Sequence, residues 1–569
     1  MQTEPETSRT SSLLSYAILL GGILTIAVSL YMVVASYSSL PFGDGWTQIE
    51  VVARGNSPFS PAWLWQQHNE HRMVLPKLFL GVDLRWFRAR QGFLLASILA
   101  IQLLHWGVLV WSMRVLGGWR GDLWRTGAGL AAFCLLCPSQ WENFTSGFQV
   151  CFVLPQLLAT LSFVAFVLYW MKSQQDPDKS PPSTFLVISV LAALGASYCL
   201  ASGSLLWPLL VAAALYLRLR LAAVLSFAVT GVVSTALYFY HYVRPGAHAS
   251  PIVSLEAPVS LVKYWAFYMG GPWEHHGMRE PEILALAGIG VLLALLAPAL
   301  EEVRRFRPFA IQLALTMPFC LATGLLTAVG RVDLGLGQAL SSRYQTVALL
   351  FWCCLGLFFV GSTFFARYGA VLTQVCLLAI FVRGAVLAHY PLEQARQRAL
   401  AQHELAASLV TGAFDPERLK DIRRDTLLLT LPYLKANRLS AFSNSAASDL
   451  GKPLESVIPF ANSDDCTGAL ESGARMDDPD GPGLRIAGWA WDRKHRQPPS
   501  TVVVTTGGII TGMGAVGQWR RDVRVANPEV SSSYVGFVAF VPETQPNSVV
   551  KLYAILRGSP ATACYLPGK

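Results

Sequence analysis

The chain has 569 residues, of which 53% are hydrophobic and only 14% are charged, and its mean hydropathy is +0.42. A soluble domain has about 25% charged residues, so this composition excludes an ordinary soluble enzyme and indicates a polytopic membrane protein. The net charge of +9 lies largely in short basic loops between apolar runs, and no Walker loop is present. We therefore expect a membrane partner and no nucleic acid.

The first apolar run, residues 13–35, follows a polar tail at 1–12. The run is long and is followed by a poor cleavage site, so we interpret it as an uncleaved first span rather than a secretory signal. A span needs about 20 apolar residues to cross the membrane core. Ten further runs predict spans, at 92–113, 126–137, 150–171, 184–200, 204–217, 221–242, 283–300, 309–329, 344–365 and 368–389. The predicted fold is an α-helical membrane domain at 13–390 with about 11 spans.

Lysine and arginine in the short loops orient these spans, because basic residues favour the cytoplasmic side. With the N-terminus inside, the inner loops carry Arg114, Arg120, Arg125, Lys172, Lys179, Arg218, Arg220, Arg304, Arg305, Arg307 and Arg367. The long first outer loop, 36–91, holds six basic residues, but long loops weigh less in this rule. This topology predicts a bacterial inner-membrane protein whose C-terminal domain lies outside the cytoplasm.

A competing interpretation makes residues 73–87 a span, which would reverse the later loops. We prefer a helix on the membrane surface there, with Lys77, Arg85 and Arg88 near lipid headgroups.

Polar and aromatic side chains gather in the predicted outer loops. They are Asp44, Trp46, Glu50, Glu70, His71, Arg72, Trp141, Glu142, Asn143, Gln149, Lys263, Glu274, His275, Arg331, Arg343 and Tyr344. Charge beside a bilayer is costly, so it usually pairs, lines a wet cavity or serves function. Carboxylates act as general bases, and guanidinium groups fork onto phosphate oxygens. Aromatic rings stack on sugars or mark the membrane interface. Together these groups predict transfer of a group from a lipid phosphate, with ordinary solvated loops as the alternative.

An N-terminal span, a large external loop with an early aspartate, surface helices and about ten more spans resemble the GT-C superfamily of membrane glycosyltransferases. The likeness covers residues 13–390 and lies in layout more than in motif. The better-known branches follow their acidic motif with a Pro-Pro-Leu stretch. This chain has HNEHRMVLPKLF there, so it resembles a divergent branch. The resemblance implies transfer of a sugar from a polyprenyl-phosphate donor to a glycan, lipid or protein acceptor of the cell envelope.

The resemblance also implies roles for residues. The family carboxylate maps to Asp44 as the base of an inverting transfer, with Glu50, Glu70 and His71 as further catalytic candidates. The donor phosphate is expected at Arg72, Arg331, Arg343, Tyr344 and Lys263. Sugar or acceptor contacts are expected from Trp46, Trp141, Glu142, Asn143, Gln149, Glu274 and His275. No cofactor is expected. A divalent metal stays as an alternative, because HNEH and EHH hold ligand types but lack the HExxH spacing.

The tail differs in composition from the membrane domain. Residues 391–465 predict a helical linker, with an Asp-Pro pair at 415–416 suited to a helix start. Residues 466–569 hold β-rich runs between Gly, Pro and Asn turns and predict a small β-sandwich. The pattern GWAWD…GQWRRDV…GF resembles small domains appended to bacterial glycosyltransferases. Trp489 and Trp491 are expected in its core rather than on sugar. Cys466 and Cys564 are the two tail cysteines, and we predict that they form a disulfide.

Other functions stay open at this stage. One is a transporter or flippase for lipid-linked glycans, although no pseudo-repeat of helices is visible. Another is a membrane acyl- or phosphoalkyl-transferase acting on envelope glycans. The nearest intramembrane histidines, His105 and His241, lack an evident partner for acyl transfer. A third is a non-catalytic scaffold whose β-domain binds glycan.

Overall fold

A computed structural model describes residues 6–175, 182–244, 256–274, 307–361, 370–543 and 550–567. The chain divides into two compact units. The membrane unit comprises Met1–Ala35, Phe59–Leu80 and Leu94–Gln394, and the tail unit comprises Ser36–Pro58, Gly81–Phe93 and Ala395–Lys569. Two pieces of the predicted first outer loop, 36–58 and 81–93, therefore fold with the C-terminal part. The sequence had placed them with the membrane domain.

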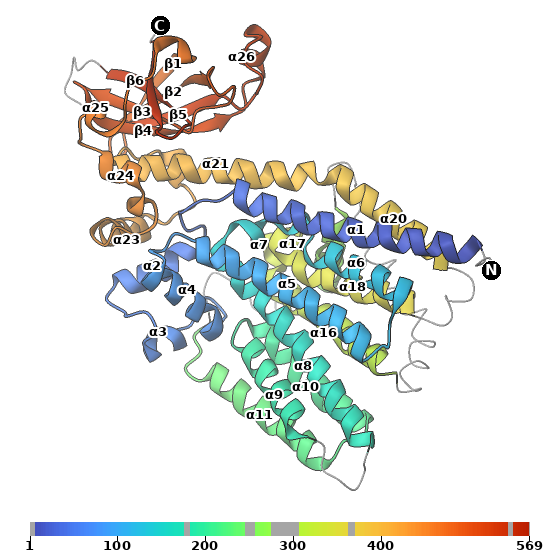
Figure 1. Ribbon diagram of the computed structural model, residues 1–569. Coiled ribbons are helices and arrows are strands. Elements are labelled where there is room, and N and C mark those ends of the chain that lie inside the picture. Colours follow the sequence, from blue (N-terminus) through green and yellow to red (C-terminus); the bar gives the residue numbers. More distant parts are fainter. Residues whose placement is uncertain are drawn as a thin grey trace. The chain divides into compact units, whose positions relative to one another are not determined.

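The membrane unit is all helical (Figure 1). Its main helices are α1 (Glu6–Ala35), α5 (Gly92–Val115), α6 (Gly121–Leu135), α8 (Val150–Gln175), α9 (Ser183–Ser197), α10 (Leu206–Tyr216), α11 (Leu221–Phe239), α13 (Pro258–Gly270), α16 (Pro308–Arg331), α18 (Gln345–Gly361) and α20 (Ala370–Leu387). Short helices α3 (Pro61–Trp65), α7 (Trp141–Thr145) and α17 (Leu336–Ala339) lie between them. Helix α4 (Val74–Trp86) runs from the membrane unit into the tail unit, and so does α21 (His389–Thr411).

Seven helices in the described part of the chain are long and apolar enough to cross a membrane, as a multi-pass membrane protein requires. They are Thr10–Ala35, Gly92–Val115, Gly147–Gln175, Leu221–Phe239, Pro308–Leu334, Ser342–Gly361 and Gln374–Thr411. The predicted count of about 11 is therefore not confirmed by the described residues. The runs at 184–200 and 204–217 correspond to shorter apolar helices, Ser183–Ser197 and Ala201–Tyr216, and α6 has only 15 residues. The run at 283–300 lies outside the described residues.

Helix α1 packs closely against α6 because glycines face each other at the crossing. A Cβ on Gly22 would lie 2.6 Å from the backbone oxygen of Gly129, and a Cβ on Gly129 would lie 2.5 Å from the oxygen of Ile18. Small residues let helix backbones approach in this way in membranes, where dispersion contacts replace the hydrophobic driving force. Ser29 adds a hydrogen bond from its Oγ to the carbonyl of Leu136, at 2.5 Å.

Two cations of the predicted first outer loop, Lys77 and Arg72, are buried rather than exposed at the membrane surface. Lys77 on α4 is 1% exposed and donates to the carbonyls of Trp63 and Gln66, at 2.7 and 2.6 Å. Arg72 is 3% exposed and donates to the carbonyls of Trp65, Tyr238 and Tyr240. The expectations of a headgroup role for Lys77 and a donor-phosphate role for Arg72 are therefore wrong. Buried guanidinium and ammonium groups that are bound to carbonyls hold the loop together instead.

The tail unit begins with α2 (Gly45–Ala53) packed on the linker helices α22 (Pro416–Leu419) and α23 (Arg424–Ala436) and on α21. Trp46 and Ile49 of α2 are each 3% exposed and share an apolar cluster with Leu405 and Leu427. Trp46 is thus a core residue, which corrects its expected role in sugar binding. Asp415 accepts the backbone N–H of Glu417 at 3.0 Å, so the predicted helix start at 415–416 is confirmed.

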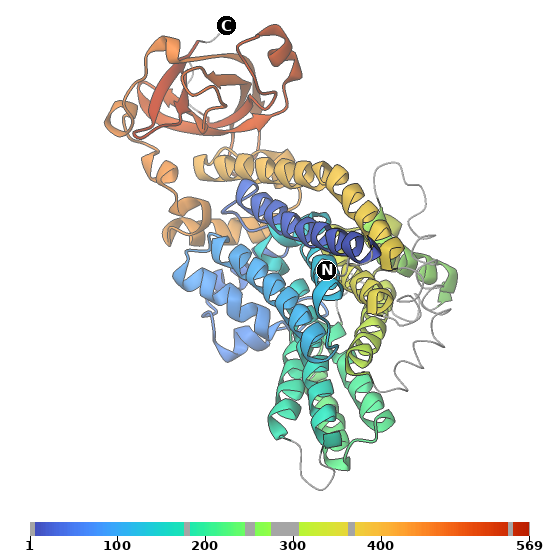
Figure 2. The same cartoon turned by 45° about the vertical axis from the view of Figure 1, so that its right-hand side comes forward.

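The tail unit ends in one seven-stranded antiparallel sheet, not a two-sheet sandwich. Its strands are β1 (Cys466–Met476), β2 (Gly483–Asp492), β3 (Thr501–Thr506), β4 (Ile509–Gln518), β5 (Gly536–Pro542), β6 (Val550–Leu556) and β7 (Thr562–Leu566), in the order β1-β2-β5-β4-β3-β6-β7. Figure 2 shows this sheet curled on itself. The end strands β1 and β7 are joined by a Cys466–Cys564 disulfide, the pair expected from the sequence.

Two sequence features of the sheet find structural roles. Trp491 is 1% exposed in a cluster with Val523, Val530 and Val535, and Trp489 packs partly against them. The stretch GMGAVG at 512–517 has the GxGxxG spacing of dinucleotide-binding loops, but it lies within strand β4. Such a loop must join a strand to a helix N-terminus to bind phosphate, so this one is not a nucleotide site. A Cβ on Gly512 or Gly514 would collide with β5, which explains the glycines.

Candidate functional site

A cavity of about 630 Å³ opens within the membrane unit. Its walls are largely apolar and come from three neighbouring helices, α6, α18 and α20. The apolar lining includes Leu130, Phe133, Leu349, Trp352, Leu355, Phe359, Leu377, Ile380 and Leu387. A volume of this order suits a ligand of drug size or one section of a longer chain. Because α18 and α20 lie in membrane-length helices, the apolar part suits a lipid tail.

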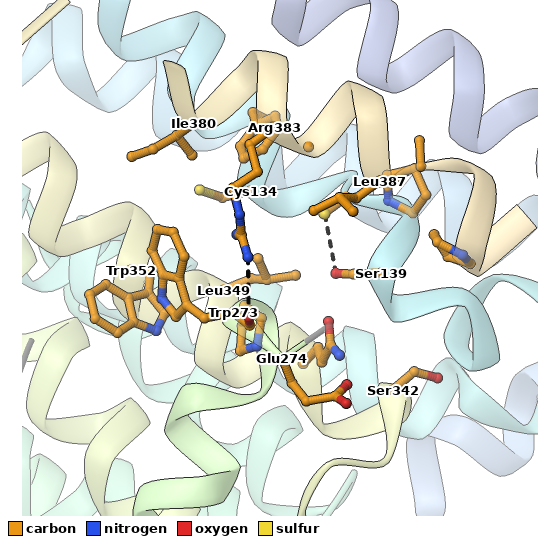
Figure 3. A pocket seen from close by; sticks show the side chains of 18 of the residues that line it. Cys134, Ser139, Trp273, Glu274, Ser342, Leu349, Trp352, Ile380, Arg383 and Leu387 are labelled. Atoms are coloured by element: carbon orange, nitrogen blue, oxygen red, sulfur yellow. Dashed lines mark hydrogen bonds between the residues drawn. The ribbon is translucent and has the colours of Figure 1, made fainter. Parts of the chain in front are cut away.

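One end of this cavity is polar. Ser139, Glu142, Glu274, Ser342, Gln345 and Arg383 line it, and Figure 3 shows several of them around the open space. They come from the short segments that follow α6, α13 and α17, from the first residue of α18, and from α20. In the predicted topology all of these loops lie on the outer face. The cavity therefore combines an apolar slot with a small set of convergent polar groups.

Glu142 fastens two of these loops together. Its Oε2 accepts the hydroxyl of Ser342 at 2.9 Å and the backbone N–H of Arg343 at 3.1 Å, and its own N–H donates to Ser342 Oγ at 3.1 Å. Asn143 adds bonds from its Nδ2 to the carbonyl of Arg343 and to Thr346 Oγ1, at 3.0 and 2.8 Å. Asn143 is fully buried, so its role is to hold this turn rather than to contact a sugar.

A buried amide network lies behind the Glu142 loop. Gln102 Nε2 on α5 donates to Gln140 Oε1 at 3.1 Å, and Thr346 Oγ1 donates to the same oxygen at 2.7 Å. Gln140 in turn donates to the carbonyl of Leu135 at 2.7 Å. All three side chains are buried. Buried hydrogen bonds of this kind favour one arrangement of their helices, although Gln102 Oε1 itself has no hydrogen-bond partner in the described structure.

Arg383 is a residue that sequence reasoning missed. It is the one charged side chain of α20, and it points from that helix into the cavity (Figure 3). Its Nη2 lies 3.5 Å from the carbonyl oxygen of Trp273, and its guanidinium lies 6.0 Å from the centre of the Trp273 ring. Within the described residues no carboxylate forms an ion pair with it. A lone arginine inside an apolar run is costly and usually functional, and that signal was available in the sequence.

Glu274 lies one residue after Trp273, at the same end of the cavity. Its backbone N–H donates to Gly271 at 3.1 Å, and Gln345 Nε2 also donates to the Gly271 carbonyl, at 3.4 Å. The Trp352 indole holds the preceding Met269 carbonyl at 2.9 Å. The segment is therefore fixed from two sides. No residue in the described ranges hydrogen-bonds to the Glu274 carboxylate, which faces the cavity.

A second charged cluster, also in the membrane unit, joins Glu70, His71 and Arg331. Arg331 at the end of α16 forms an ion pair with Glu70. The Nε2 of His71 lies 3.5 Å from Glu70 Oε1, and its Nδ1 accepts the backbone N–H of Ala201 at 3.3 Å. The structure thus brings together two catalytic candidates, Glu70 and His71. Arg331, which was expected to bind the donor phosphate, instead pairs with Glu70. The charge of this arginine is already compensated by a carboxylate.

The other expected phosphate ligands, Tyr344, Arg343 and Lys263, differ in how far they are buried. Tyr344 is 6% exposed and stacks on Tyr268 with ring centres 5.2 Å apart, so it is a packing residue rather than a phosphate ligand. Its hydroxyl accepts Gln338 Nε2 at 3.0 Å. Arg343 lies partly buried with its guanidinium 5.4 Å from the Tyr344 ring. Lys263 is exposed on α13.

Two catalytic candidates belong to the tail unit. Asp44 is an exposed residue at the start of α2, and its side chain does not cap that helix. Glu50 accepts Thr426 Oγ1 at 2.6 Å and Arg54 Nη2 at 2.8 Å. Burial opposes ionisation of Glu50, but these two hydrogen bonds outweigh it, so its pKa is lowered. A carboxylate held in its charged form by two donors is a weakened base.

Trp141 lines the cavity beside Glu142, whereas Gln149 is buried before α8 and is absent from the lining. His275 lies outside the described residues. Among the described residues no group of three or more His, Cys, Asp and Glu side chains is arranged to hold a metal ion.

Comparison with known proteins identifies no family. No protein-family model matches the chain, and no curated protein matches it. A solved structure that does match is the Archaeoglobus fulgidus oligosaccharyltransferase, crystallised as a complex with Zn and sulfate. The identity is 11% and the TM-score 0.33, over 70% of this chain and 56% of that one. The chain thus spans just over half of that enzyme, and a TM-score this low leaves the function to be argued from the residues themselves.

Proposed function

We propose that this protein is a membrane glycosyltransferase that moves a sugar from a polyprenyl-phosphate donor to an acceptor of the cell envelope. The observation that carries the proposal is the amphiphilic cavity of the membrane unit. An isoprenoid tail matches the apolar walls from α6, α18 and α20. A phosphate and its sugar match the polar end, where Arg383, Glu142 and Glu274 converge.

The polar end offers the groups that glycosyl transfer needs. Departure of a lipid phosphate leaves negative charge, which a cation stabilises when it is fixed in advance. A carboxylate accepts the proton of the attacking hydroxyl. Trp141 and Trp273 provide ring faces and edges beside the same space. Asp44, the base implied by the resemblance, stays a prediction.

Photo-crosslinking tests the location of the donor. A synthetic polyprenyl-phosphate sugar with a photoreactive group in its tail is added to the full chain in nanodiscs, and the crosslinked peptides are sequenced. We expect labels on α18 and α20, at positions such as Phe359 and Leu377. Labels confined to lipid-exposed positions such as Leu237 on α11, which is 48% exposed, would contradict the proposal.

A flippase would use the same cavity but would leave the sugar on its lipid. Reconstituted vesicles carrying labelled donor separate the two functions. Transfer appears as loss of label from the polyprenyl phosphate when an envelope extract is supplied, whereas flipping changes only the leaflet from which the label can be reached.

A further inference from the structure

The oppositely charged pair Glu274 and Arg383 remains unexplained by packing. Each lines the cavity beside its polar residues, and within the described residues neither forms an ion pair. Arg383 Nη2 lies 3.5 Å from the carbonyl of Trp273, the residue before Glu274. Consecutive Cα atoms are about 3.8 Å apart, so the guanidinium lies beside the segment that carries Glu274, and both residues line the same cavity. Uncompensated charges in such a place call for a ligand that satisfies both.

We propose that Glu274 is the general base of the transfer and that Arg383 holds the departing phosphate; this rests on the proposed function. The Glu274 carboxylate takes the proton of the acceptor hydroxyl, and the hydroxyl oxygen forms a bond to the anomeric carbon. The bond from that carbon to the phosphate oxygen breaks, and its electron pair stays on the phosphate. The new negative charge then lies beside the guanidinium of Arg383.

The alternative carboxylates are less suited to this step. Glu142 uses its Oε2 to hold Ser342 and the Arg343 N–H, so protonation there would weaken the turn it organises. Glu70 is engaged by Arg331. Glu274 is held through its backbone by Gly271, and no described side chain occupies its carboxylate. Of the three, Glu274 combines a fixed position with an available carboxylate.

Binding measurements on nanodisc-reconstituted full chain test Arg383. The probes are synthetic polyprenyl phosphate, the uncharged polyprenol of the same length, and inorganic phosphate. We expect wild type to bind polyprenyl phosphate at least tenfold more tightly than polyprenol, and inorganic phosphate not to displace it. Arg383→Gln should remove that preference and Arg383→Lys should restore only part of it, because lysine cannot fork. The matched control is Arg114→Gln, since Arg114 stacks on Trp124 at 4.0 Å and does not line the cavity.

Turnover measurements test Glu274 in the same preparation, with labelled donor and envelope extract. Glu274→Gln should keep polyprenyl phosphate affinity within twofold and lower transfer by about 10²–10⁴-fold, the size of general-base catalysis. Glu274→Asp should recover part of the rate. Asp425→Asn is the control variant, because that carboxylate is 81% exposed and does not line the cavity, so it should retain the transfer. Asp44→Asn tests the rival base: loss of transfer in that variant with near-normal turnover by Glu274→Gln would return the role to Asp44.

The outcomes separate the two proposals. Equal binding of phosphate and polyprenol by wild type would overturn the proposed function itself. Normal phosphate preference in Arg383→Gln, or near-normal transfer by Glu274→Gln, would overturn the present inference and leave the function standing. Loss of lipid binding by a Glu274→Gln protein that melts like wild type would make Glu274 a binding residue and likewise remove its role as base.

Discussion

Glu142 and Ser342, 200 residues apart in the chain, are joined by two hydrogen bonds. The Ser342 hydroxyl donates to Glu142 Oε2 at 2.9 Å and accepts the Glu142 backbone N–H at 3.1 Å. Both residues line the cavity, so this pair of hydrogen bonds sets the distance between two of its loops. The polar end of the site therefore depends on a contact that neither loop could form alone.

Replacing Ser342 by alanine should remove both bonds and leave a partly buried carboxylate oxygen with one donor fewer. We expect a loss of about 1–2 kcal/mol in the free energy of unfolding, seen as a lower Tm in detergent. Donor affinity should fall as well, because the loops separate. Ser226→Ala on α11 is the matched control, since that hydroxyl is exposed and bonds only within its helix. A Ser342→Ala protein as stable as wild type would refute this.

The Arg331–Glu70 pair should contribute stability rather than donor binding. In a double-mutant cycle of Arg331→Gln and Glu70→Gln, we expect a coupling energy of about 1 kcal/mol, because the two side chains are only 20% and 26% exposed. Arg331→Gln should leave polyprenyl phosphate affinity unchanged within twofold. A large loss of lipid affinity without coupling would return Arg331 to the phosphate site that the sequence suggested.

The sequence predicted what depends on local pattern. Long apolar runs gave the membrane-length helices, and the Asp415–Pro416 pair gave a helix start. Strands β2 to β6 were predicted from β-rich runs bounded by turns, such as Gly507–Gly508 with φ of +59° and +82°. Some predicted spans are too short to cross a membrane. The run at 126–137, for example, lies in α6, which has only 15 residues and an acidic residue in its first turn.

The site was harder to predict because it depends on partners distant in sequence. Arg72 and Arg343 read alike as outer-loop arginines, yet only Arg72 is enclosed by the carbonyls of residues 65, 238 and 240. Trp46 was predicted to contact sugar from an outer loop, but helix α2 buries its side chain in the apolar cluster of the tail unit. Sequence shows that a loop is polar, and it does not show which of its donors are already satisfied.

A glycine at the close crossing of α1 and α6 should respond to substitution in the opposite way to a glycine outside that crossing. Gly129→Ala should destabilise by about 1–3 kcal/mol, since its Cβ would lie 2.5 Å from the backbone oxygen of Ile18, which cannot move aside as a side chain can. Gly107→Ala on α5 meets nothing within 4 Å and should be neutral or stabilise by up to about 1 kcal/mol. Melting of both variants in the same detergent is the measurement. Equal Tm values would contradict the crossing.

The disulfide between Cys466 and Cys564 tests topology as well as stability. It closes the sheet by joining β1 to β7 across 98 residues, so its loss should cost about 2–5 kcal/mol. Thiol labelling of denatured protein should modify these two cysteines only after reduction. If they label as free thiols without reduction, the tail is in a reducing compartment or the bond does not form. The predicted external orientation of the tail is tested separately in intact cells: labelling of the two cysteines only after the inner membrane is opened would overturn it.

Asp83 predicts a stability that falls as pH rises. Its side chain is 1% exposed in the tail unit, and burial raises its pKa to about 7, although the backbone N–H of Gln91 donates to Oδ2 at 3.2 Å. A folded pKa above the unfolded value of 3.8 means that the fold favours the protonated acid. The resulting stability is present below pH 4 and is lost between pH 4 and 7, by up to about 4 kcal/mol at about 1.4 kcal/mol for each pH unit.

Asp83→Asn keeps an oxygen for the Gln91 N–H and removes the charge. The variant and the wild type should therefore melt alike near pH 4, and the variant should melt higher at pH 8. Asp425→Asn is the matched control, because that carboxylate is 81% exposed and should leave the difference between pH 4 and 8 unchanged. Parallel melting curves for Asp83→Asn and wild type across this range would show that Asp83 is ionised in the folded protein at all of these pH values, and that water reaches it.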